Sequence, residues 1–283
     1  MINIYVMVSY FIGLIDLIAS IFCISKASKL RPNTYLGFRI PQAFLTQKIW
    51  MKVNILAGML GFINFVIIVI LSLFVQNICL MMYAILSIMF IVSALSIYSR
   101  RIIERETGRE SGGEQPVEVL PVIKVSILLI FLGWIIISAF TIFVLLSRHQ
   151  LPEVIAVHFN IEGNPDIFMH RDEFLISFIA LTIGSMITLT SILFSIKDVP
   201  SLKEFESYNK ALVSILQVLI ICIPLLQGYV YLVIYLYNAF MIRVPVIVNV
   251  VAILALILIV IFGAIKYLRK ETNQQSHKRF ADE

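Results

Sequence analysis

Long apolar runs separated by short polar segments dominate the chain. Seven of them, rich in Ile, Leu, Val and Phe, reach the length of about 20 residues that a helix needs to cross a bilayer core. They occupy residues 4–25, 53–75, 77–98, 123–147, 174–196, 211–236 and 244–268. The runs lack the apolar and polar alternation of barrel strands. The pattern predicts an all-α integral membrane protein with a seven-helix transmembrane bundle.

A charged segment interrupts this pattern after the third run. Residues 99–119 are rich in Arg and Glu and include Ser-Gly-Gly at 111–113 and Pro116. We expect a short helical extension followed by a flexible linker, which divides the bundle into three plus four helices. The predicted parts are a three-helix module at 1–100, a charged cytoplasmic linker at 101–121, a four-helix module at 122–270 and a cytoplasmic tail at 271–283.

Composition supports the membrane prediction, and the basic residues orient it. Of the 283 residues, 60% are apolar and only 14% are charged, too few to cover a soluble protein of this size. Alternating spans place 19 of the 22 Lys and Arg residues on one side, which the positive-inside rule makes the cytoplasm. We therefore expect a cell-membrane protein with its amino terminus outside and its carboxyl terminus inside. Its basic loops favour membrane lipids as partners, and not nucleic acid.

The segment between the first two runs carries the most specific pattern of the chain. It reads Asn-x-x-Leu-Gly-x-Arg-x-Pro, with a Trp nine residues later and an Asn four residues after that. Its members are Asn33, Gly37, Arg39, Pro41, Trp50 and Asn54. The pattern resembles the signature loop of the SdpI family, bacterial membrane proteins that include toxin-immunity proteins. The resemblance implies protection against, or sensing of, a secreted membrane-active peptide, with that peptide or a cytoplasmic regulator as partner.

The physical chemistry of this loop adds expectations of its own. Gly37 can adopt a positive φ, and Pro41 can start a helix of about 41–52 that lies along the inner membrane surface. We expect four apolar side chains of that helix to face lipid: Phe44, Leu45, Ile49 and Trp50. Three roles stay open for Arg39, which are binding to neighbouring carbonyls, to a phosphate or lipid, or to a protein partner.

A second pattern follows the fourth run, on the expected outer side. Its members are Pro152, His158, Asn160, Gly163, Pro165 and Asp166. It is similar to a small membrane domain of unknown function that often accompanies the SdpI domain. The loop is rich in His, Asp and Glu, but their spacing matches no established metal motif, so we expect no metal site. We expect a turn at 164–166 with His158 or Asp166 tied to loop backbone, and recognition of an outer ligand stays open.

Polar residues also occur inside the apolar runs. A stripe of small or polar residues in the first run predicts close helix packing: Ser9, Gly13, Asp16, Ser20, Cys23 and Ala27. Asp16 and Asn64 both lie near the expected bilayer midplane, and we predict a hydrogen bond between them. The same depth count pairs Gln227 with Asn249. Asp16 has two possible roles, structural pairing or proton-linked ligand binding, so a small proton-linked transporter is the alternative function.

The remaining chemistry of the chain is sparse. It contains no phosphate-binding glycine loop, no nucleophile motif and no cysteine pair at redox or metal spacing, so we expect neither an enzyme nor a cofactor. We expect tyrosines near the end of the sixth run to anchor it at the membrane surface, with Trp50 doing so on the inner side. These tyrosines are Tyr229, Tyr231, Tyr235 and Tyr237.

Overall fold

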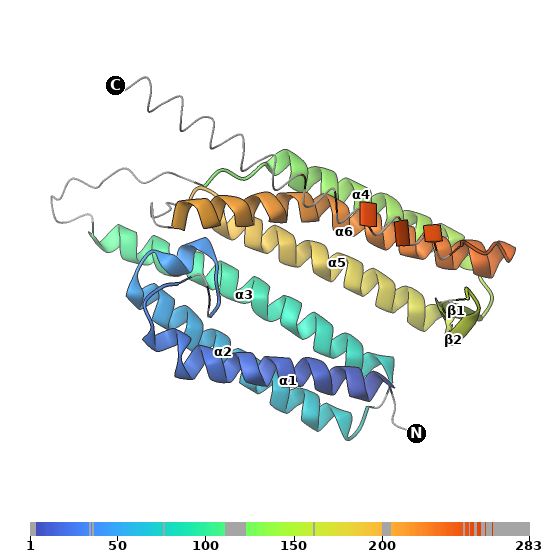
Figure 1. Ribbon diagram of the computed structural model, residues 1–283, viewed down its shortest axis with the longest axis horizontal. Helices are drawn as coiled ribbons and strands as arrows, with labels where there is room; N and C mark the ends of the chain where they lie inside the picture. Colours follow the sequence, from blue (N-terminus) through green and yellow to red (C-terminus); the bar gives the residue numbers. More distant parts are fainter. Residues whose placement is uncertain are drawn as a thin grey trace. The chain divides into compact units, whose positions relative to one another are not determined.

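Six long helices dominate the described part of the chain (Figure 1). The computed structural model describes residues 4–110 except 34, 36 and 76, residues 123–199 except 161, residues 205–245, and scattered positions between 247 and 262. The helices are α1 (Ile4–Ser25), α2 (Gln47–Ser72), α3 (Ile78–Glu110), α4 (Ile127–Ser147), α5 (Arg171–Ile196) and α6 (Glu206–Phe240). All six are long and apolar enough to cross a membrane. The protein is therefore a multi-pass membrane protein.

Six of the seven expected spans are thus present, and the seventh, at 244–268, falls largely outside the described residues. The helical extension expected after the third span is confirmed, because α3 continues to Glu110. Residues 111–122, which include most of the expected linker, also lie outside the described part of the chain.

Local capping explains where two of these helices begin. The Thr46 hydroxyl accepts a hydrogen bond of 3.1 Å from the Ile49 backbone N–H at the start of α2. Ser126 does the same for Leu129 at the start of α4. Each cap satisfies a backbone donor that has no partner within the helix.

A two-stranded hairpin interrupts the helical pattern between α4 and α5. It consists of β1 (Val154–Phe159) and β2 (Pro165–His170), paired antiparallel, with a register shift near His158. The expected turn at 164–166 is wrong, because Pro165 and Asp166 belong to β2. The chain reverses at 160–164 instead, where the Asn160 side chain accepts hydrogen bonds from the Glu162 and Asn164 backbone N–H groups. Gly163 has φ +79° there.

The chain forms two compact units. The first contains α1, α2, α3, the last residues of α5 from Ile187 and the segment as far as Lys210. The second contains α4, the hairpin, α5 as far as Met186, and α6 from Ala211. In the first unit α1, α2 and α3 pack against one another (Figure 1). Helix α5 therefore contributes residues to both units.

The small-residue stripe of α1 packs against α2 as expected. Ser9, Gly13 and Ser20 are buried. A Cβ at Gly61 of α2 would lie 2.4 Å from the Ser20 hydroxyl oxygen, and a Cβ at Gly58 would lie 2.9 Å from the Ser20 carbonyl oxygen. Only glycine permits this approach, which brings the two backbones close together.

The predicted surface helix at 41–52 is wrong. A 3-10 turn, η2 (Pro41–Phe44), precedes Thr46, and α2 starts at Gln47. The four side chains expected to face lipid lie instead in a core with Ile102, Ile103 and Phe205, where Phe44, Ile49 and Trp50 are at most 2% exposed. Phe44 stacks on Phe205 with ring centroids 4.5 Å apart. Burial in lipid and burial in protein are both favourable for an apolar side chain. The sequence therefore did not distinguish a lipid-facing position from a core position.

The second unit has an aromatic core that corrects the prediction for two of the tyrosines. Tyr231 is fully buried and Tyr235 is 8% exposed, so neither is a surface anchor. The Tyr231 hydroxyl lies 2.6 Å from the Ser147 hydroxyl oxygen, and both rings pack against Phe143. The hydrogen bond satisfies a polar atom that would be costly to bury alone.

Candidate functional site

Asn54 of α2 is at the centre of the signature loop. Its side-chain carbonyl oxygen accepts a hydrogen bond of 2.7 Å from the Phe38 backbone N–H, and its amide nitrogen donates to the Trp50 carbonyl at 2.9 Å. The side chain is fully buried. Asn54 therefore fixes the loop backbone against the first turns of α2.

Gly37 is the position that this arrangement constrains most. Its φ is +96°, a region that L side chains rarely adopt. A Cβ there would lie 2.3 Å from the Asn54 side-chain oxygen and 2.9 Å from the Ala27 Cβ. Both the backbone conformation and the space available therefore require glycine. The positive φ expected from the sequence is confirmed.

Trp50 joins the loop to the end of α1. Its indole N–H donates a hydrogen bond of 2.6 Å to the Ala27 carbonyl, which lies in the 3-10 turn η1 (Ala27–Lys29). The prediction that Trp50 anchors at the membrane surface is therefore wrong. It is a buried residue whose one polar atom is satisfied.

Asn33 and Pro41 shape the two ends of the loop. The Asn33 side chain accepts from the Tyr35 backbone N–H at 3.0 Å and donates to the Arg31 carbonyl at 2.9 Å, so it forms a local turn. Pro41 is buried and starts the 3-10 turn η2. Both residues therefore act on the conformation of the loop itself.

Arg39 differs from the other members of the signature. It is the one member of the six whose side chain is exposed. Its guanidinium is close enough to Tyr208 for the two to interact electrostatically. The structure thus assigns five signature residues to the conformation of the loop and presents the sixth at its surface.

The predicted contact between Asp16 and Asn64 is confirmed. The Asn64 amide donates a hydrogen bond of 2.6 Å to an Asp16 carboxyl oxygen. Tyr83 of α3, which the sequence did not single out, donates from its hydroxyl to the Asn64 side-chain oxygen at 3.2 Å. A chain of hydrogen bonds therefore crosses three helices inside the apolar part of the first unit.

A pocket of about 210 Å³ adjoins this hydrogen-bond chain. Asp16, Ser20 and Cys23 of α1 line one side, and Gly37 and Phe38 of the signature loop line another part. The pocket therefore brings together Asp16 and the loop, which the sequence had treated as separate candidates.

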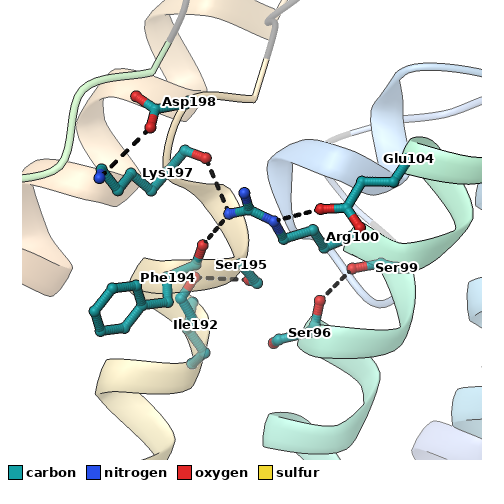
Figure 2. A network of polar contacts seen from close by, with 9 residues as sticks. All are labelled: Ser96, Ser99, Arg100, Glu104, Ile192, Phe194, Ser195, Lys197 and Asp198. Atoms are coloured by element: carbon teal, nitrogen blue, oxygen red, sulfur yellow. Dashed lines mark hydrogen bonds and ion pairs between the residues drawn. The ribbon is translucent and has the colours of Figure 1, made fainter. Parts of the chain in front are cut away.

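Arg100 makes a contact that sequence reasoning missed. Figure 2 shows its side chain reaching from α3 to the end of α5, where it donates to the Phe194 carbonyl at 2.5 Å and the Lys197 carbonyl at 3.2 Å. Its third partner is Glu104, at 3.0 Å. The last carbonyls of a helix lack partners within it, so Arg100 caps α5. Asp198, with φ +60°, ends the helix beside this cap.

The hairpin carries the other sequence candidates. His158 and Asp166 face each other across the strands, with 2.6 Å between His158 Nδ1 and an Asp166 carboxyl oxygen. The two side chains therefore pair with each other. The prediction that one of them binds the loop backbone is wrong. Pro152 is exposed, before β1. Among the described residues no group of three or more His, Cys, Asp or Glu is placed to hold a metal ion.

Asn238 of α6 attaches the hairpin to the helices of the second unit. Its side chain both accepts from the Ala156 N–H, at 2.8 Å, and donates to the Ala156 carbonyl, at 2.9 Å. Gln227 of α6 donates to the Ser185 hydroxyl at 3.4 Å, and its expected pairing with Asn249 stays a prediction. Asn249 lies outside the described residues.

Six long apolar helices in the described residues define a multi-pass membrane protein, in which the signature loop borders a pocket. Residues 29–99 match the SdpI/YfhL protein family, and residues 134–183 match a domain of unknown function, DUF1648. Part of the first unit thus resembles the SdpI/YfhL family, and part of the second unit resembles this further domain. A comparison with curated proteins and with solved structures gave no match.

Proposed function

We propose that the protein protects its host against a secreted membrane-active peptide, or senses one. The match to the SdpI/YfhL family supports this class of function. The observation that carries the proposal is the construction of the signature loop, in which hydrogen bonds and packing hold the backbone and Arg39 is the exposed member. A loop that is rigid before binding loses little entropy when its exposed group engages a partner.

The proposal includes an orientation and a mode of action. The amino terminus lies outside the cell membrane and the carboxyl terminus in the cytoplasm, which puts Arg39 at the inner surface. There its planar guanidinium can bind a lipid phosphate or an acidic group of a cytoplasmic regulator. The protein acts by binding and not by catalysis.

Expression in a peptide-sensitive host tests this function. Cells that make the protein should survive secreted membrane-active peptides at concentrations that kill cells without it. Arg39→Ala should abolish survival while the amount of protein in the membrane stays unchanged. Arg31→Ala is the matched control, because Arg31 is an exposed basic residue of the same segment outside the signature.

The outcomes separate recognition by Arg39 from general loss of charge. Survival lost only with Arg39→Ala supports the proposal. Equal survival of both variants, or equal loss, would show that Arg39 has no specific part. A wild-type protein that protects against no peptide in a broad panel would overturn the protective function itself.

A small proton-linked transporter is the second candidate. The hydrogen-bond chain from Tyr83 through Asn64 to Asp16 favours it, because an acid inside a membrane commonly carries protons or a ligand. Proton flux into proteoliposomes, followed with a pH-sensitive dye, tests this candidate. Flux that Asp16→Asn leaves unchanged, or no flux in the wild type, counts against it.

A further inference from the structure

The pocket beside Asp16 has polar atoms along its α1 side and an apolar wall on α3. Asp16, Ser20 and Cys23 supply polar atoms, whereas α3 contributes only apolar side chains, Ile88, Ile91, Val92 and Leu95. Its volume of about 210 Å³ has room for a short aliphatic chain and not for a phospholipid with two acyl tails. The pocket therefore matches a small amphiphile.

The direction of the hydrogen bonds specifies the polar group of that amphiphile. Tyr83 donates to Asn64, and Asn64 donates to Asp16, so both bonds point toward the carboxyl group. A carboxylate has about four acceptor positions and donates nothing. Among the described residues, Asn64 supplies the only hydrogen bond to the Asp16 side chain. Asp16 is thus the end of a chain of donors and has acceptor capacity left for another donor.

We infer that this pocket binds a short aliphatic primary amine, whose ammonium group donates to Asp16. An anionic headgroup would be repelled by the carboxylate. A purely apolar ligand would leave the carboxylate without a counter-charge in a medium where an unpaired charge is costly. An ammonium supplies both the charge and the donors, and the alkyl chain covers the aliphatic wall of α3.

This inference does not rest on the protective function. Gly37 and Phe38 of the signature loop also line the pocket, but Asp16 lies outside residues 29–99, and Arg39, on which the protective function rests, does not line the pocket. A protein that fails to protect its host against peptides could still bind the amine. A protein that fails to bind the amine could still protect its host. The two proposals are therefore tested separately.

Cys23 provides a built-in reporter, because it lines the pocket. Replacing Cys79 and Cys222 by Ser leaves it as the one cysteine of the chain. In nanodiscs, its alkylation by N-ethylmaleimide is timed in the presence of nonylamine, nonanol or nonanoate, three probes of one chain length. Nonylamine should slow the reaction at concentrations about tenfold lower than nonanol, as one charge-assisted hydrogen bond implies. Nonanoate should have the weakest effect.

Two variants and a second reporter make the result decisive. Asp16→Asn should remove the advantage of nonylamine over nonanol. Ala57→Leu, which fills the pocket from α2, should remove protection by both probes, and it keeps the test informative if Asp16→Asn fails to fold. A chain whose single cysteine is Cys79, which is exposed and outside the pocket, should show no protection.

Three outcomes would overturn the inference. The first is equal protection by nonylamine, nonanol and nonanoate. The second is an amine advantage that persists in folded Asp16→Asn. The third is equal slowing of Cys79 alkylation, which would mean that the amine acts through the bilayer.

Discussion

Substitution of Gly37 by alanine tests the central claim about the signature loop. The glycine has φ +96°, and forcing an alanine into this conformation costs about 1–3 kcal/mol. The new Cβ would also lie 2.3 Å from the Asn54 side-chain oxygen, so that side chain must move. Its movement leaves the Phe38 N–H without an acceptor, which adds about 1–3 kcal/mol. We expect a total loss of about 2–6 kcal/mol in the free energy of unfolding.

Two further variants separate the backbone cost from the clash. Gly163→Ala is the matched control, because Gly163 has φ +79° but no atom lies within 4 Å of an added Cβ. It should lose only the backbone cost of about 1–3 kcal/mol. Asn54→Ala removes the clashing oxygen in advance. Gly37→Ala should then cost less in that background than in the wild type, by about the value of the lost hydrogen bond.

The free energy of unfolding can be measured by titration with sodium dodecyl sulfate in mixed micelles, following helix content. The double-mutant cycle of Gly37→Ala and Asn54→Ala gives the coupling directly. Additivity of the two variants within about 0.5 kcal/mol would refute the proposed contact. Equal costs of Gly37→Ala and Gly163→Ala would also do so, because they would leave no role for the crowded space.

Three further substitutions test contacts that position the site. Trp50→Phe removes the indole N–H that donates to Ala27, and the melting temperature should fall by an amount equivalent to about 1–3 kcal/mol; an unchanged melting temperature would contradict a buried hydrogen bond. Arg100→Ala should speed amide hydrogen exchange at the end of α5, while Glu104→Ala, which changes the exposed partner, should have little effect. Asn238→Leu should speed exchange of the Ala156 N–H, and unchanged exchange would refute the docking of the hairpin on α6.

The helices and one long-range contact followed from the sequence. Length and hydropathy were sufficient to predict six spans, because a helix in lipid must satisfy its own backbone hydrogen bonds. Counting residues from the ends of two runs then placed Asp16 and Asn64 at equal depth, and they are bonded. Depth is a property that sequence position gives directly once the spans are known.

Other features depend on whether a side chain faces lipid or the protein interior. The position of a residue in the sequence does not tell the two apart. Trp50 and Tyr231 were expected at the membrane surface, yet both are fully buried. Lipid and protein interior are equally apolar, so hydrophobicity alone carries no signal that distinguishes them. Arg100 was missed for a different reason. Its partners at the end of α5 are the backbone carbonyls of Phe194 and Lys197, and no side-chain pattern marks a carbonyl that lacks a partner.

Different residues of the first unit determine the conformation of the loop and the choice of ligand. Five signature residues are occupied with the shape of the loop, and their substitution should act through folding. Asp16 lies outside the matched segment 29–99, and it supplies the acidic group of the pocket. Chains that share the signature can therefore share the loop and still bind different ligands. A change at Asp16 should alter ligand chemistry with the loop intact, whereas a change at Gly37 should destroy the loop first.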